Sequence, residues 1–124
     1  MNVVDSSGWL EYFADGENAA FFADTVKATS DLIVPVVCLY EVFKRVSLQR
    51  GEGPALQAVA IMQQGRVVEL TATIALSAAA LSLEHKLPMA DSLILATARD
   101  HDATLWTQDA DFAGMTGVEY IAKP

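Results

Sequence analysis

The sequence predicts an α/β protein of three layers, in which a parallel five-stranded sheet lies between helices (α/β/α). The first observation behind this class is that short β-rich apolar runs alternate with stretches of helical spacing along the chain. The second is that no repeat, low-complexity tract or linker divides it, so we expect one domain over residues 1–124. Apolar residues make up 52% of the chain, which is enough for one buried core. Strands separated by helices pair in parallel through right-handed crossovers, which places helices on the faces of the sheet.

The five predicted strands are short apolar runs rich in Val, Ile and Leu, with Thr and Trp in the fourth. Pro35 ends the second run, because proline lacks the backbone donor that continues a ladder. In chain order, the strands are expected at Asn2–Val4, Leu32–Val34, Val67–Leu70, Thr104–Thr107 and Val118–Ile121.

The predicted helices have apolar residues three and four positions apart. Gly51 and Gly53 separate the third helix from the fourth, Pro54 suits a first helical turn, and Pro88 opens the last helix. In the third helix we expect one buried face made of Val36, Leu39, Tyr40, Phe43 and Val46. In chain order, the helices are expected at Gly8–Ala14, Asn18–Thr29, Val36–Gln49, Pro54–Gln64, Thr73–Lys86 and Met89–Asp100.

Charge and composition narrow the classes of function. The net charge is −8, which at face value disfavours nucleic acid, although a bound divalent cation inverts the local field and readmits a phosphodiester substrate. Cys38 is the only cysteine, so no internal disulfide forms, and a reducing, cytoplasmic setting is expected. No apolar run approaches the roughly 20 residues of a membrane span, and no secretory signal is visible.

Four acidic residues stand where the chain changes direction. Asp5 and Asp109 come just after predicted strands, where open parallel sheets bind their ligands. Asp91 lies in the first turn of an apolar helix, and Glu41 lies within the apolar run 35–46. Acids that converge from separate elements repel one another unless a cation binds between them. The sequence therefore predicts a metal site.

Each acid also has a purely structural explanation. Asp5 is a favoured helix N-cap, and Asp91 gains from the helix dipole without a metal. Asp109 and Asp111 are common turn formers. Glu41 has possible ion-pair partners three and four residues further along its helix, in Lys44 and Arg45.

The donor types indicate which metal such a site prefers. A set of carboxylates without a histidine or cysteine cluster suits Mg²⁺, with Mn²⁺ as a substitute, better than zinc. His85 and His101 lack metal-ligand spacing, and Cys38 is expected to be a core residue.

Four segments in order resemble the PIN-domain family, and more narrowly the VapC-type toxin ribonucleases of type II toxin–antitoxin pairs. They are DSSGWLEYF, VPVVCLYEVFKRV, LPMADSLILATA and TLWTQDADF. The resemblance implies a single PIN domain acting as a Mg²⁺-dependent endoribonuclease that hydrolyses RNA with a carboxylate-held metal. By position, Asp5, Glu41, Asp91 and Asp109 match the family's catalytic, metal-binding quartet, with Asp5 and Asp91 as principal ligands.

The resemblance also implies accessory residues and partners. Ser7 and Thr107 match hydroxyl positions that support the acids, and Asp111 is a further acid that either joins the site or shapes the loop. A homodimer and a cognate antitoxin protein are expected, the antitoxin wrapping the toxin. The basic residues available to hold RNA are few: Lys44, Arg45, Arg50, Lys86 and Arg99.

Three other classes of protein compete with this interpretation of the sequence. A phosphoacceptor receiver domain needs an acidic pair after the first strand and an acceptor Asp after the third. Here Asp5 stands alone and the third strand ends in Glu69, Leu70 and Thr71, so this class is excluded. A haloacid-dehalogenase-type phosphatase needs a second Asp at the position that Ser7 occupies. The remaining alternative is a non-catalytic PIN-like module that binds RNA or protein, which a metal-dependent cleavage assay separates from a nuclease.

Overall fold

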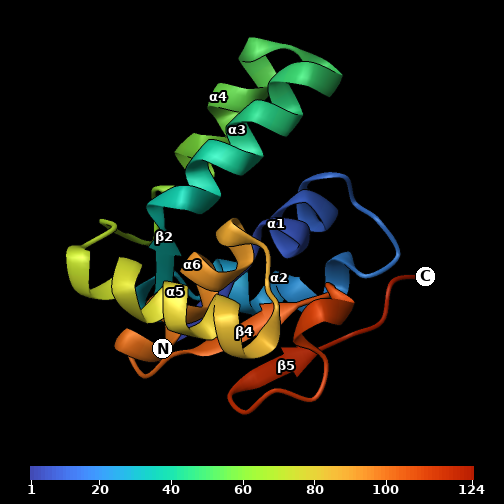
Figure 1. Cartoon of the computed structure of the whole chain (residues 1–124). Coiled ribbons are helices and arrows are strands. Elements are labelled where there is room, and N and C mark those ends of the chain that lie inside the picture. Colours follow the sequence, from blue (N-terminus) through green and yellow to red (C-terminus); the bar gives the residue numbers. More distant parts are fainter.

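The computed structural model describes all residues from Met1 to Pro124 and has a parallel five-stranded sheet at its centre (Figure 1). The strand order is β3-β2-β1-β4-β5, so the chain builds outward from β1 to one side and then to the other. The predicted fold class is therefore confirmed. The strands are β1 (Asn2–Val4), β2 (Leu32–Pro35), β3 (Arg66–Val68), β4 (Thr104–Thr107) and β5 (Val118–Tyr120).

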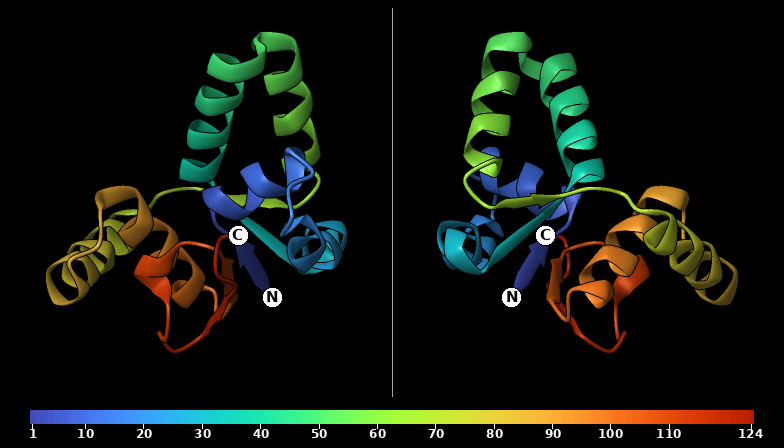
Figure 2. Two further views of the ribbon diagram at one scale, coloured as in Figure 1. Left: turned by 90° about the vertical axis from the view of Figure 1, so that its right-hand side faces the viewer. Right: turned by 90° about the vertical axis from the view of Figure 1, so that its left-hand side faces the viewer.

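The helices form the two outer layers and a projecting hairpin. Helix α2 packs on β1 at one face, and α6 packs on β2 and β4 at the other, with α5 against α6 (Figure 2). Helices α3 and α4 pair side by side and extend away from the sheet. No helix combines the length and apolar character that a membrane span requires. The helices are α1 (Ser6–Phe13), α2 (Ala19–Lys27), α3 (Val36–Arg50), α4 (Glu52–Met62), α5 (Ala72–His85) and α6 (Met89–Asp100), with short 3₁₀ turns η1 (Thr29–Asp31) and η2 (Ala110–Phe112).

One main core holds the layers together. Val3 of β1 pairs with Ile33 of β2 and with Leu105 of β4, and all three side chains are buried. Helix α6 is buried along most of its length, because the sheet covers one side and α5 covers another. Since α6 carries Asp91 in its first turn, this double packing holds that carboxylate in a fixed place.

Of the face predicted to be buried on α3, only Val46 is buried. Tyr40 is 63% exposed and Phe43 is 36% exposed, whereas the buried side chains are those of Cys38, Val42 and Val46. The cause is tertiary: α3 packs against α1 and α4, so the stripe that faces these helices is buried, and the apolar residues beside it face solvent.

Three strands also have bounds that differ from the prediction, and of these β5 differs only in ending at Tyr120 instead of Ile121. Pro35 lies inside β2, where it pairs with Val68, and needs no donor because it is the last residue of its strand. Strand β3 covers Arg66–Val68, so Glu69 and Leu70 fall outside it in an exposed connection to α5.

Gly8 provides a test of how closely α1 packs. A Cβ atom at Gly8 would lie 2.7 Å from both Phe22 and Val4, whereas one at Gly53 in α4 would meet nothing within 4 Å. We predict that Gly8→Ala lowers the free energy of unfolding, because overpacking costs about 1–3 kcal/mol and outweighs the roughly 1 kcal/mol helix preference of Ala. Gly53→Ala, the matched control, should instead raise it by about 0.5–1 kcal/mol. Urea unfolding measures both changes, and a stabilising Gly8→Ala would contradict the packing shown.

Candidate metal centre

The topology brings the carboxylates of Asp5 and Asp109 to one edge of the sheet. Asp5 directly follows β1, and Asp109 comes two residues after β4, the strand beside β1. The order of strand addition reverses between β1 and β4, and a crevice outside the strand ends opens at such a switch point. The sheet itself therefore positions these two acids.

Asp5 is 2% exposed and is held by three donors. The amide of Gly8 donates to its Oδ1 at 2.9 Å, which also caps α1. The hydroxyl of Thr107 donates to Oδ2 at 2.6 Å, and that of Ser7 lies 2.8 Å from Oδ1 and 3.0 Å from Oδ2. Thr107 in turn accepts a hydrogen bond from the amide of Asp109 at 2.9 Å, so one hydroxyl ties β4, Asp5 and the following turn together.

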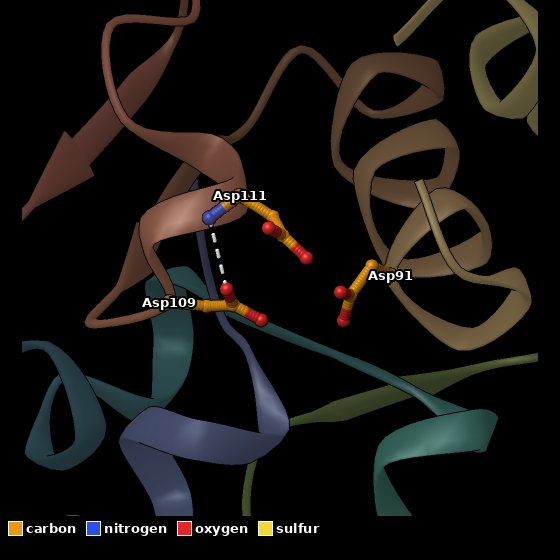
Figure 3. Close-up of side chains that lie close together, drawn as sticks. All are labelled: Asp91, Asp109 and Asp111. Atoms are coloured by element: carbon orange, nitrogen blue, oxygen red, sulfur yellow. Dashed lines mark hydrogen bonds between the residues drawn. The ribbon is translucent and has the colours of Figure 1, made fainter. Parts of the chain in front are cut away.

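A cluster of three carboxylates lies beside Asp5. Asp91 of α6 faces Asp109, which immediately precedes η2, and Asp111, which lies within it. One carboxylate oxygen of each lies within 4.8 Å of the others (Figure 3). The amide of Asp111 donates to Oδ1 of Asp109 at 2.9 Å, which fixes the turn between them. The group is partly open to solvent, since Asp91 and Asp109 are half-buried and Asp111 is exposed.

Glu41 of α3 lies close enough for its charge to act on Asp91, but neither Glu41 nor Asp5 belongs to the group of three clustered carboxylates. Oε1 of Glu41 accepts a hydrogen bond of 2.6 Å from the hydroxyl of Ser6, and the Glu41 side chain is half-buried. Neither Lys44 nor Arg45 lies within 4.0 Å of an acid, so the ion pair considered for Glu41 is absent. Ser6 was not among the predicted site residues, and nothing in the sequence links it to an acid 35 positions away.

The electrostatics show that negative charge is concentrated here. Burial raises the pKa of Asp5 to about 6, against the opposing effect of hydrogen bonds from Thr107, Gly8 and Ser7. Burial also raises the pKa of Asp91 to about 7, and the charges of Asp109 and Asp5 add to this, with a smaller contribution from Glu41. A bound cation would lower the pKa values of both carboxyl groups again, because it favours the ionised carboxylates.

The donor set fits a hard divalent cation. The clustered ligand atoms are all carboxylate oxygens, the donors that Mg²⁺ and Mn²⁺ take. Neither a histidine nor Cys38 belongs to the cluster; Cys38 is fully buried, and burial raises the pKa of its thiol far above the ordinary value. The cluster therefore offers no sulfur or imidazole ligand, which softer metals prefer.

The structural and the metal-binding explanations of single acids are not exclusive. Asp5 does cap α1, and Asp109 does cap η2. Each uses Oδ1 for its cap, and Asp109 keeps Oδ2 directed toward Asp91 (Figure 3). Asp111 contributes to the turn through its backbone amide, which donates to Asp109, and its carboxylate lies in the cluster.

Fold and site together define a parallel α/β domain with an acidic centre at its switch point. Residues 3–118 match the PIN domain family, and because this match spans most of the chain, the protein belongs to that family. A comparison with curated proteins gives no match.

Several solved structures share this fold. A toxin–antitoxin complex from Klebsiella pneumoniae is 24% identical, with a TM-score of 0.80 and 96% of each chain covered. The sarcin–ricin loop cleaving toxin VapC20 from Mycobacterium tuberculosis is 22% identical, with a TM-score of 0.77 over 96% of this chain and 99% of that one. VapBC2 from Rickettsia felis, bound to a promoter DNA fragment, is 15% identical, with a TM-score of 0.75 over 96% and 97%. At these identities the likeness shows the fold.

The raised pKa of Asp91 predicts a pH-dependent effect on stability without metal. Because the pKa in the folded protein, about 7, exceeds the ordinary 3.8, the folded state loses stability as pH rises through that window. In EDTA, Asp91→Asn should therefore raise the melting temperature at pH 8 and change it much less at pH 4, where the native carboxyl is protonated. Asp24→Asn, on the exposed side of α2, is the matched control. An equal rise of the melting temperature at both pH values for Asp91→Asn would contradict the charge crowding.

Proposed function

We propose that this protein is a Mg²⁺-dependent endoribonuclease and the toxin component of a toxin–antitoxin pair, its single PIN domain spanning residues 1–124. The observation that carries the proposal is the group of three carboxylates, Asp91, Asp109 and Asp111, facing one another at the switch point of a PIN fold. RNA as the substrate class draws support from the Mycobacterium tuberculosis structure, a toxin that cleaves the sarcin–ricin loop.

Each acid has a distinct proposed role. Asp5 and Asp91 are the principal metal ligands, and Asp109 and Glu41 complete the catalytic set. We add Asp111 as a ligand because its carboxylate lies with those of Asp91 and Asp109. Ser7 and Thr107 support the site through their hydrogen bonds to Asp5.

The chain's own groups prepare the site for phosphodiester hydrolysis. Bound Mg²⁺, or Mn²⁺ in its place, would neutralise charge that develops on the phosphate and activate a water. Thr107, Gly8 and Ser7 orient Asp5 and favour its ionised form. Ser6 donates only to Oε1 of Glu41, which leaves Oε2 free to accept a hydrogen bond from water at the edge of the centre.

The proposed partners are a cognate antitoxin and a second copy of this chain. Support for an antitoxin comes from the structures that share the fold, among them the Klebsiella pneumoniae toxin–antitoxin complex. Support for a homodimer comes from large apolar side chains that α5 and the start of α6 expose, Leu76, Leu83 and Met89. We propose the cytoplasm as the site of action, where RNA and an antitoxin meet the toxin.

The first functional prediction concerns the two principal ligands. Asp5→Asn and Asp91→Asn should each lower RNA cleavage with Mg²⁺ by at least about 100-fold, since even partners outside the metal's ligand set are worth about 10–100-fold. Circular dichroism should show an unchanged fold, and Asp24→Asn should cleave like the wild type. Full activity of either variant would refute the assignment of that residue as a principal ligand, whereas absence of cleavage by the wild type would favour a PIN-like binding module.

The second functional prediction concerns the metal. EDTA should abolish cleavage by the wild type, and added Mg²⁺ or Mn²⁺ should restore it, because the clustered ligand atoms are all carboxylate oxygens. Gel analysis of cleaved RNA measures both steps. Cleavage that persists in EDTA would contradict a metal-dependent mechanism.

A further inference from the structure

Three exposed cations lie on the side of the centre formed by α3 and the C-terminal segment. Lys44 and Arg45 follow Glu41 by about one helical turn on α3, and Lys123 lies near the end of the chain. Like every other Lys and Arg of the chain, none of them forms an ion pair with an acid, although acidic residues outnumber basic ones by 16 to 8. Cations left free in an acidic protein are available for an anionic ligand.

These cations line two clefts that meet. The first, of about 360 Å³, is bounded by Ser6 and Glu41 on the side of the acidic centre and by Tyr40, Lys44 and Arg45 on the other. The second, of about 280 Å³, runs past Ser7, Gln108 and Lys123 and also includes one acid, Glu11. Arg45 and Leu10 line both clefts, so the two form one continuous surface that borders the centre.

The ends of this surface are fixed by specific contacts. Asn18, which is buried, donates one hydrogen bond to Gln108 and another to the carbonyl of Ala122, both of 3.0 Å, and these hold the C-terminal segment that carries Lys123. At the other end, Lys44 Nζ lies 5.6 Å from the centre of the Tyr40 ring and 3.5 Å from its hydroxyl. The aromatic ring thus positions Lys44 without neutralising it.

We propose that Lys44, Arg45 and Lys123 form a track that binds the sugar–phosphate backbone of single-stranded RNA and leads it to the acidic centre. The inference rests on the proposed function and names the residues that hold its substrate. Phosphates are repelled by the carboxylate cluster, so a strand needs cations beside it. Arg45, at the junction of the clefts, has the planar donor geometry that binds a phosphate through two hydrogen bonds. Tyr40, 63% exposed, offers a ring on which a base stacks.

An acidic protein segment is the other polyanion that suits cations. The observations favour RNA, because the track adjoins Ser6 and Glu41 at the acidic centre and includes an exposed aromatic ring. A peptide that needs only positive charge has no use for either feature. The experiment below separates the two ligands.

The test measures binding of a fluorescein-labelled single-stranded oligouridylate by anisotropy, in EDTA and over a series of salt concentrations. The track variant is Lys44→Gln/Arg45→Gln/Lys123→Gln. The control variant, Lys27→Gln/Arg66→Gln, removes two positive charges from exposed positions outside the clefts, and the slopes are compared per charge removed. Each lost phosphate contact reduces the slope of log K against log salt by about 0.7, so the track variant should lose about 2 from the slope. The control should keep the wild-type slope.

Each outcome decides the inference separately from the nuclease proposal. Wild-type RNA cleavage together with an unchanged slope in the track variant would overturn the track and leave the nuclease standing. A reduced slope without cleavage by any preparation would keep the track and remove the nuclease. No wild-type binding at low salt, or an equal slope loss per charge removed in both variants, would overturn the track. Tighter wild-type binding of an oligoglutamate peptide of equal net charge than of the RNA would assign the surface to an acidic protein and also overturn it.

Discussion

Mutual repulsion of carboxylates at the carboxyl edge of the sheet is the constraint to which the surrounding structure responds. Burial alone makes ionisation of Asp5 unfavourable, and an amide and two hydroxyls offset part of that effect. Those three donors come from the first turn of α1 and the end of β4, so their geometry depends on the register between β1 and β4. A fold that holds negative charges this close without an internal cation gives up stability, and a cation bound at this edge would recover that stability by relieving the repulsion.

Most of the architecture followed from local pattern. β4 has its predicted bounds because a short β-rich run lies between turn residues, and α6 begins where Pro88 permits a first turn. The buried face of α3 could not be predicted from local pattern. Val42 is buried and Tyr40 is exposed because of how α3 packs against α1 and α4. An apolar residue on a helix indicates a face that can be buried, but tertiary packing determines which face is buried.

The site was predictable to the extent that strand order decides it. Asp5 and Asp109 could be placed together because both follow strands of a parallel sheet, and a switch point at β1 and β4 makes them neighbours. Asp111 had two open roles, since a turn acid looks the same with and without a ligand role; only the folded chain places its carboxylate near those of Asp91 and Asp109, which supports the ligand role proposed for it. The contact between Ser6 and Glu41 had no sequence signal, because α3 reaches α1 through packing of the hairpin.

The net charge of −8 and an RNA substrate are compatible once charge is considered locally. At an ionic strength of 0.1 M the Debye length is about 10 Å, so a phosphate responds to the groups beside it and hardly to the sum over the chain. Much of the acidic excess is dispersed over exposed positions such as Asp24, Glu52 and Glu84, which a strand at the switch point would not meet. Close to the centre, Asp91 and its neighbours carry a negative charge that a divalent ion offsets, and free cations border it on the α3 side. A bound metal therefore does two things at once: it relieves the repulsion among the carboxylates and changes the sign of the field that an approaching phosphate meets.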